Sequence, residues 1–273
     1  MPELPEVETV SRDLSGTLLG LTIKKVEIID ARVVRDILPA KFCAVLKAKI
    51  IKRISRRGKA IIFGFDSGPF FIVQLMMTGQ LVHAAALPVP VLKETKVIFT
   101  LSDGSHLLYN DQRLFGRLTL IENLNDFRHF QLLGPEPFET DFNPDYMQGV
   151  LKNKTVAIKK VLLDHGFVAG IGNIYASEIL FRCRIDPRRN AKSLDVKEIT
   201  SLHYQIIEVL QEAIEYRGSS MRNYRDGQGK KGRFNERIRV YARENESCPN
   251  CSHKVLRITQ GGRSTFFCKK CQR

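Results

Sequence analysis

The chain has 273 residues, and its 43 lysines and arginines exceed its 29 aspartates and glutamates by 14. Such an excess is typical of a protein that binds nucleic acid, although a ribosome-associated or membrane-surface protein has a similar balance. No apolar run reaches the roughly 18 residues of a membrane span, and the start lacks the pattern of a secretory signal. We therefore expect a cytoplasmic protein without a membrane partner.

The chain starts with Pro2 and Glu3, just before apolar residues spaced as one face of a helix over 6–18. Removal of Met1 would leave Pro2 with a secondary amine. The pKa of an α-amino group is about 7.7–8.0, so a fair share is unprotonated at neutral pH and can attack a sugar C1′ to form a Schiff base. Glu3 would supply a carboxylate as general acid or base. A flexible, polar terminus is the alternative interpretation.

Residues 22–122 have the composition of an antiparallel β layer. Five stretches rich in Ile, Val and Phe, at 22–29, 60–65, 70–76, 96–101 and 117–121, are separated by turn signals such as Asp103-Gly104. This pattern predicts a β-sandwich or barrel.

Two kinds of side chain at the predicted strand ends are candidates for contact with DNA. The run from Arg53 to Lys59 concentrates positive charge that could neutralise phosphates, and a solvated strand edge is its alternative. Met76-Met77 and residues 111–116 each end a predicted strand. Met, Phe and Arg at such positions are either core residues or wedges that enter a base stack, and spacing alone does not decide between them.

A stiff connector at 134–137, Gly-Pro-Glu-Pro, predicts a domain boundary, and the chain after it turns helical. Residues 195–216 carry the stripe of an amphipathic helix. The long, Gly- and Arg-rich loop at 217–237 is of a kind that is functional or disordered. Asn173 follows Gly170-Ile171-Gly172 before a helix at 176–182, which suits either phosphate binding or close helix packing.

Four of the six cysteines, Cys248, Cys251, Cys268 and Cys271, crowd the last 26 residues. Two Cys-x2-Cys pairs separated by sixteen residues fit one tetrahedral zinc ion. Because the protein would fill all four positions, the zinc would be structural; paired disulfides are the alternative. Strands at 254–259 and 264–267 would form a hairpin with Arg263 at its tip, unless Arg263 is an ordinary surface residue.

Seven motifs in chain order resemble the formamidopyrimidine-DNA glycosylase family. They are MPELPEVET at the start, RRGK ending at Lys59, LMMTG at 75–79, DQRLFG at 111–116, LGPEP at 133–137, GNIYASE at 172–178, and the cysteine-rich end closing in CQR. The related endonuclease VIII branch begins Pro-Glu-Gly-Pro-Glu. Residues 2–6 here read Pro-Glu-Leu-Pro-Glu, which favours the bacterial formamidopyrimidine branch.

The resemblance implies an α+β fold in four parts. Residues 1–128 would form an N-terminal antiparallel β-sandwich with flanking helices, and 129–143 a linker. Residues 144–237 would form a helix–two-turn–helix domain whose loop at 217–237 closes over the everted base. Residues 238–273 would form the zinc-finger hairpin, with one structural zinc ion and no organic cofactor.

The resemblance also implies a bifunctional base-excision enzyme acting on damaged double-stranded DNA. It would remove oxidised purines, chiefly 8-oxoguanine opposite cytosine and formamidopyrimidines, and nick the strand by β,δ-elimination. Pro2 would be the Schiff-base nucleophile, Glu3 the acid/base with Glu6 in support, and Lys59 a phosphate contact that assists proton transfer. Arg263 would serve δ-elimination. In a bacterium we expect a monomer associated with the nucleoid.

The remaining residues that the resemblance assigns would contact DNA. Arg113 would pair with the orphaned cytosine and fill the vacated space together with Met77 and Phe115. Asn173 and Arg263 would grip the kinked phosphates. The other assigned contacts are Gln74, Lys154 and Tyr241.

Three positions depart from the family pattern. Gln74 stands where a phosphate-contacting His is usual, Leu114 where Lys or Arg is frequent, and residues 94–96 where many relatives carry a His-rich run. Each alters a DNA contact, so lesion preference stays open. An enzyme that prefers oxidised pyrimidines or hydantoins is one alternative, and a zinc-ribbon protein that only binds damaged DNA is another.

Overall fold

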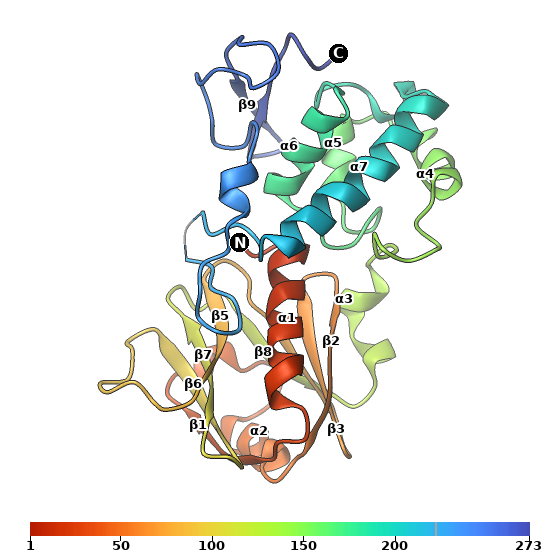
Figure 1. Ribbon diagram of the computed structural model, residues 1–273. Coiled ribbons are helices and arrows are strands. Elements are labelled where there is room, and N and C mark those ends of the chain that lie inside the picture. The colour runs from red at the N-terminus through yellow and green to blue at the C-terminus, as the bar shows by residue number, and fades with distance from the viewer. Residues whose placement is uncertain (222) are drawn as a thin grey trace. The chain divides into compact units, whose positions relative to one another are not determined.

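The computed structural model describes residues 1–221 and 223–273, and it divides into two compact units (Figure 1). The first unit comprises Met1–Gln131 and Tyr216–Asn235, and the second comprises Leu132–Glu215 and Glu236–Arg273. Among the described residues, no helix has the length and apolar character needed to cross a bilayer.

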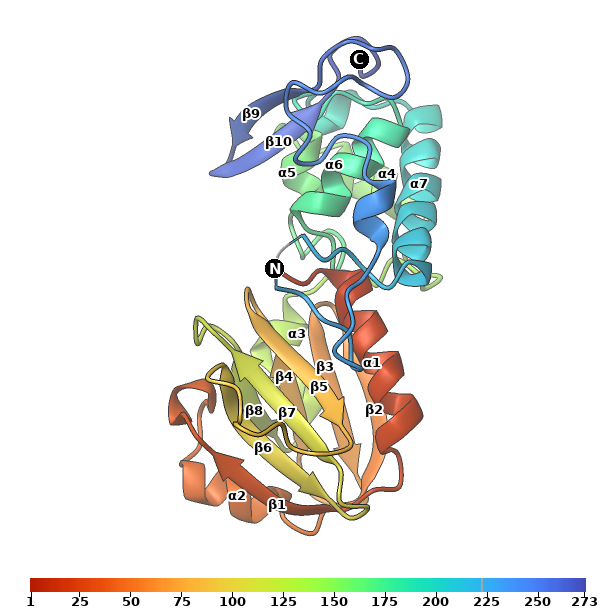
Figure 2. The same ribbon diagram turned by 60° about the vertical axis from the view of Figure 1, so that its left-hand side comes forward.

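The first unit contains two antiparallel four-stranded sheets, which confirms the predicted β-sandwich (Figure 2). One has the order β1-β6-β7-β5 and the other β2-β3-β4-β8. Phe71 from the second sheet and Phe99 from the first have ring centroids 5.5 Å apart, so the sheets share one core. The strands are β1 (Ile23–Ile28), β2 (Ile51–Arg57), β3 (Ala60–Phe65), β4 (Phe70–Gln74), β5 (Gly79–Ala84), β6 (Thr95–Leu101), β7 (His106–Asp111) and β8 (Arg117–Ile121).

Helix α1 (Leu4–Leu18) packs on this core through the apolar stripe that the sequence predicts. Val7, Val10, Leu14 and Leu18 are all fully buried. Pro at an early helical position suits this start, because its missing N–H would have no partner there. The unit also contains η1 (Ala31–Val33), α2 (Pro39–Leu46), η2 (Leu124–Asp126) and α3 (Arg128–Gln131).

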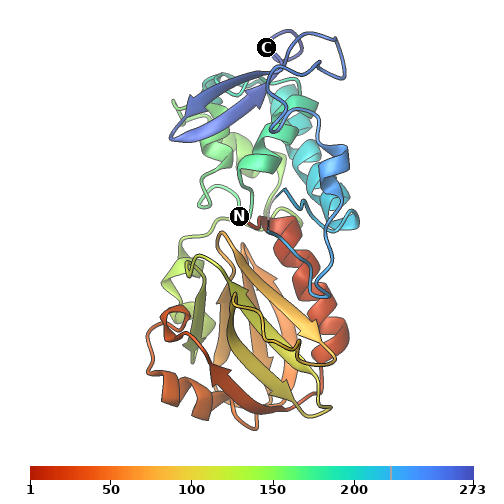
Figure 3. The same ribbon diagram turned by 90° about the vertical axis from the view of Figure 1, so that its left-hand side faces the viewer.

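The second unit is helical and ends in a two-stranded hairpin, as the sequence predicts (Figure 3). Its longest helix, α7 (Val196–Glu215), buries Leu202, Ile206 and Val209 along one face. Strands β9 (Leu256–Gln260) and β10 (Arg263–Phe267) pair antiparallel. The remaining elements are α4 (Pro144–Leu151), α5 (Ile158–Leu162), α6 (Asn173–Arg182), η3 (Ala191–Ser193) and η4 (Phe234–Arg237), the last of which starts within the first unit.

The loop that follows α7 packs with the β-sandwich. The resemblance predicts residues 217–237 as part of the helical domain, whereas Tyr216–Asn235 belongs to the first unit. Residue 222 of that loop lies outside the described residues. The reason is long-range hydrogen bonding: Ser219 donates its N–H to Glu6, and His83 donates its N–H to the Gly227 carbonyl.

Candidate active site and nucleic-acid interface

The start of α1 brings the predicted catalytic residues of the N-terminus together. Pro2 and Glu3 are buried just before the helix, and Glu3 is its N-cap. Glu3 and Glu6 form a capping box, in which the Glu3 N–H donates to Glu6 Oε2 at 2.7 Å. This reciprocal arrangement satisfies backbone donors that the first helical turn would otherwise leave without a partner. Two carboxylates are therefore held beside the residue proposed to carry the amine.

Glu6 also ties the loop after α7 to the same place. Its Oε1 accepts the Ser219 N–H at 2.7 Å, and its carbonyl accepts the Tyr224 hydroxyl at 3.3 Å. A Cβ on Gly218 would lie 2.7 Å from Glu6 Oε1, and Gly218 has φ +76°. Only glycine fits this close approach in a left-handed conformation. The loop thus lies directly against Glu6, the proposed supporting carboxylate on α1.

Lys59 lies in the tight turn between β2 and β3, and Arg56 braces that turn. Arg56 donates to the Gly58 carbonyl at 3.0 Å and forms an ion pair with Glu8 at 2.8 Å. Arg56 therefore helps to fix the turn that carries Lys59, and its charge is paired with that of Glu8. Gln74 lies beside the turn, since it pairs with Ala60 across β3 and β4.

Glu8 is the acidic partner that holds two arginines. Its Oε1 accepts Arg12 at 2.6 Å, while Oε2 accepts Arg56. Burial alone would raise the pKa of Glu8, but hydrogen bonds and charge from Arg56 and Arg12 lower it below its ordinary value. The carboxylate is thus ionised at neutral pH, and it anchors the Lys59 turn to α1.

Met77, Arg113 and Phe115 gather at an exposed tip of the first unit. Arg113 lies with its Cζ 4.7 Å from the Phe115 ring centroid, and its NH1 is 3.8 Å from Met77 Sδ. Met77 and Phe115 are 38% and 47% exposed, so neither is the core residue that the alternative interpretation required. An exposed group of two apolar side chains around one cation is suited to contact an unstacked base.

Asp111 builds the turn that presents this tip, and it is fully buried. Its Oδ1 accepts the Arg113 N–H at 3.1 Å, and its Oδ2 accepts the Gly116 N–H at 2.8 Å. Leu114, one of the departures from the family pattern, packs against the hydrophobic core instead of joining Arg113 at the tip. The turn therefore directs the side chains of Arg113 and Phe115 outward and the side chain of Leu114 inward.

In the second unit, the start of α6 meets the hairpin that carries Arg263. Asn173 Nδ2 donates to the Ser264 carbonyl at 2.9 Å, and the buried Lys159 donates to the same carbonyl at 3.0 Å. Lys159 Nζ also donates to Thr265 Oγ1 at 2.9 Å. Asn173 is thus adjacent to Arg263, which is exposed at the first position of β10. Two predicted DNA contacts from distant parts of the sequence lie together.

Tyr241 packs against the same hairpin. The Tyr241 ring meets Phe266 edge-on with centroids 5.2 Å apart, and its N–H donates to Glu178 at 2.9 Å. Glu178 is fully buried, and burial raises its pKa even though three backbone N–H groups stabilise its charged form.

Lys154, the last predicted DNA contact of the second unit, lies just after α4. It forms a long ion pair with Asp164, with 4.0 Å between its Nζ and Asp164 Oδ2.

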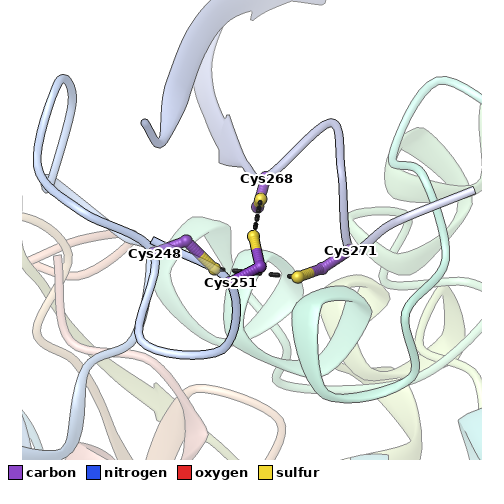
Figure 4. A group of neighbouring side chains, drawn as sticks. All are labelled: Cys248, Cys251, Cys268 and Cys271. Atoms are coloured by element: carbon purple, nitrogen blue, oxygen red, sulfur yellow. Dashed lines mark hydrogen bonds between the residues drawn. The ribbon is translucent and has the colours of Figure 1, made fainter. Parts of the chain in front are cut away.

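The four terminal cysteines converge as the sequence predicts (Figure 4). Their sulfur atoms all lie within 4.8 Å of one another, with Cys248–Cys271 at 3.8 Å and Cys251–Cys268 at 3.5 Å. A tetrahedral site with Zn–S bonds of about 2.3 Å requires sulfur–sulfur separations of about 3.8 Å. The cluster therefore fits one zinc ion with four protein ligands, which is a structural site.

Several buried residues that position the site are not among the site residues predicted from the sequence. Asp111, Lys159, Glu178 and Asp226 are buried ionisable side chains whose partners include backbone groups, the Thr265 hydroxyl and the Arg217 guanidinium. Glu178 does stand within the GNIYASE motif, so its charge in an apolar helix was an available signal. For Asp226, the composition of the loop gave no signal that this residue positions the site.

Family models cover most of the chain. The formamidopyrimidine-DNA glycosylase N-terminal domain matches residues 1–118, and the H2TH domain of the same family matches residues 133–225. A zinc finger found in FPG and IleRS matches residues 245–273.

Curated relatives and solved structures agree with the models. Formamidopyrimidine-DNA glycosylases of Pelotomaculum thermopropionicum and Heliobacterium modesticaldum are 41% and 42% identical, and each alignment spans this whole chain and 99% or 100% of the relative. Lactococcus lactis Fpg in complex with abasic DNA is 36% identical with a TM-score of 0.92, covering 99% of both chains. MutM (FPG) of Thermus thermophilus is 37% identical with a TM-score of 0.88, covering 99% of this chain and 98% of that one.

Proposed function

The chain belongs to the formamidopyrimidine-DNA glycosylase family, and we propose that it is a bifunctional DNA glycosylase and AP lyase. Its substrates are oxidised purines in duplex DNA, chiefly 8-oxoguanine opposite cytosine and formamidopyrimidines. The observation that carries the proposal is the start of α1, where Pro2 and Glu3 are buried beside Glu6 and under a loop that bonds to Glu6. A module that only binds DNA has no need of this arrangement.

Base removal starts with the amine of Pro2, which becomes the free terminal amine once Met1 is cleaved off. The nitrogen lone pair attacks C1′ of the damaged nucleoside, and the bond from C1′ to the base breaks with its electron pair leaving on the base. The base takes up a proton. The substituted nitrogen gives up its own proton and Glu3 protonates O4′, so the sugar ring opens and Pro2 remains joined to C1′ as a cationic imine, an iminium ion.

Strand cleavage follows from the acidity that the imine confers on C2′. A general base removes a proton from C2′, and the 3′ phosphate leaves in the first elimination. A second elimination then releases the 5′ phosphate. Glu3 is suited to move these protons, with Lys59 neutralising a phosphate near the lesion. Because the protein amine supplies the electron sink, the steps require no organic cofactor. Arg263 assists the second elimination.

Extrusion of the damaged nucleotide leaves a space and an unpaired cytosine. Unstacking costs a few kcal/mol, which side chains inserted into the gap can offset. Met77 and Phe115 flank Arg113 at one tip, so the three can fill the space together while the guanidinium donates to the cytosine.

Phosphate contacts come from both units. Gln74 lies beside the Lys59 turn, and Asn173 and Arg263 lie beside each other in the second unit. Lys154 and Tyr241 add further contacts. The zinc ion, bound by four cysteines, holds the hairpin that presents Arg263. The partner is damaged double-stranded DNA, bound by a monomer because a lesion has no two-fold symmetry; we place the protein in the cytoplasm, at the nucleoid.

Matched duplexes test this function. Each carries one 8-oxoguanine opposite cytosine, one dihydrouracil, or one abasic site. We expect rapid excision of 8-oxoguanine with nicking that needs no alkali and leaves phosphate on both sides of the gap. Faster excision of dihydrouracil than of 8-oxoguanine would instead show that the enzyme prefers oxidised pyrimidines. Tight binding to abasic DNA without any nicking would assign the binding module.

A further inference from the structure

The side chain of Arg217 joins two carboxylates of the first unit. Its Nε and NH2 donate to Asp226 Oδ2 at 2.8 and 2.6 Å, and NH2 also donates to Asp13 Oδ2 at 2.5 Å. Asp13 lies on α1, and Asp226 lies nine residues beyond Arg217. Asp226 is fully buried and the Asp13 side chain is 9% exposed. One guanidinium therefore closes the base of the segment formed by the described residues 218–221 and 223–225, and it ties this segment to α1.

The far end of this segment is fixed through the same two carboxylates. Asp226 Oδ1 accepts the N–H groups of Gln228 and Lys230 at 3.0 and 2.8 Å. Asp13 Oδ2 also accepts the Gly227 N–H at 3.1 Å. Without Arg217, two buried carboxylates would face each other across this turn, and their charges would repel.

The near end of the segment is strained, and the ion pairs hold it in that conformation. Arg217 has φ +61° and Gly218 has φ +76°. A left-handed conformation is unfavourable for a residue with a side chain, so it persists only where other contacts determine it. The resulting path places the Ser219 N–H on Glu6 at 2.7 Å.

We propose that Arg217 is a positioning residue for base excision, because its ion pairs hold the described residues 218–221 and 223–225 against Glu6, in the loop that under the proposed function covers the everted base. The inference rests on the proposed function. It assigns Arg217 to the step in which a base is present. Cleavage of an abasic site, where there is no base to cover, does not need the segment.

Two substitutions separate positioning from general support of the fold. Arg217→Gly removes the guanidinium and relieves the left-handed strain, so it spares the backbone. Arg217→Lys keeps the charge, but an ammonium lacks the planar fork that bonds two carboxylates at once. Lys24→Ala, which removes one exposed positive charge from β1, is the matched control.

Single-turnover rates are measured for each variant on 8-oxoguanine:C and on a preformed abasic duplex. We expect Arg217→Gly to slow base excision at least about tenfold, the effect of losing a charge-assisted hydrogen bond, while abasic cleavage stays within about twofold. Arg217→Lys should fall between Arg217→Gly and wild type, and Lys24→Ala should match wild type. Amide exchange at Ser219 should accelerate in Arg217→Gly while that of α1 stays unchanged.

An equal loss of rate on both duplexes in Arg217→Gly, or no loss of rate on either, would overturn the positioning role. So would unchanged exchange at Ser219 in a folded variant. A wild-type protein that cleaves neither duplex would overturn the proposed function itself, which keeps the two failures distinct.

Discussion

Buried carboxylates do much of the positioning in the first unit. Glu6, Asp111 and Asp226 are at most 1% exposed, yet each accepts hydrogen bonds from backbone N–H groups of a loop. A buried carboxylate without such partners would be strongly destabilising, so each one specifies a single loop conformation. The turn that Asp111 fixes presents Arg113 and Phe115, two side chains proposed to contact DNA, so an irregular segment holds a defined geometry there.

Arg113→Ala should relax the choice of base opposite the lesion. A side chain that hydrogen-bonds one base is worth about 1–3 kcal/mol of discrimination, so preference for 8-oxoguanine opposite cytosine over adenine should fall by about tenfold or more. Excision rates on the two duplexes measure this ratio. Arg128→Ala, which removes an exposed charge on α3, should leave the ratio unchanged. An undiminished preference in Arg113→Ala would contradict the assigned role.

Glu8→Gln should weaken the fold in a pH-dependent way. The folded-state pKa of Glu8 is lowered, so its contribution is present above the ordinary value near 4.5 and is lost as pH falls through the folded value. We expect a loss of about 1–3 kcal/mol at pH 7, because Arg56 would lose its charged partner. Urea unfolding between pH 2.5 and 7 should show the difference from wild type shrinking below pH 4.5.

The surface pair of Lys25 and Glu27 offers the control for this experiment. Both side chains are about half exposed or more, so Glu27→Gln should change stability little at any pH. A constant difference between Glu8→Gln and wild type across the whole pH range would show that the charge of Glu8 is not what stabilises the turn.

At the scale of elements, local patterns were reliable where a strand or helix buries one face. The stripe at 6–18 became α1, and residues 60–65 and 117–121 match β3 and β8 residue for residue. Strands β2 and β5 and helix α2 were missed, because their apolar residues are few or interrupted by polar side chains. The packing of residues 216–235 could not be predicted either, since it depends on bonds to Glu6, Asp13 and His83 far away in the sequence.

Gly116→Ala should disrupt the turn that presents Arg113. An added Cβ would lie 1.6 Å from the Tyr109 hydroxyl oxygen and 3.0 Å from Asp111 Oδ2, so the turn must shift. We expect a loss of about 1–3 kcal/mol from overpacking. Gly16→Ala in α1 meets no atom within 4 Å and should instead stabilise by about 0.5–1 kcal/mol. Thermal unfolding compares the two; equal effects would refute the packing argument.

Cys268→Ser should remove zinc and weaken DNA binding together. Loss of one thiolate opens a four-coordinate structural site, and the energy of metal binding is part of the folding energy of such a hairpin. We expect zinc content to drop from one ion per chain to nearly none, and affinity for abasic DNA to fall at least about tenfold, or 1.4 kcal/mol. Cys43→Ser should retain both. Full affinity without zinc would refute the structural role of the metal.

At the scale of the whole molecule, the proposed residues are divided between two units. The first carries Pro2, Glu3, Lys59 and the tip of Arg113, and the second carries Asn173, Arg263 and the zinc-stapled hairpin. The net charge of +14 provides attraction to phosphates without sequence preference. In the proposed assignment, base removal and lesion recognition belong to the first unit, Arg263 of the second unit assists the second elimination, and both units contact phosphates.

The nucleophilic amine of Pro2 is the central claim, and borohydride trapping tests it most directly. Reduction converts the imine into a stable covalent complex, so protein processed to remove Met1 should become crosslinked to duplexes with 8-oxoguanine:C and with an abasic site. Pro2→Gly should weaken trapping, and protein that retains Met1 should give none. Undiminished trapping and nicking by protein that mass spectrometry shows to retain Met1 would contradict the claim.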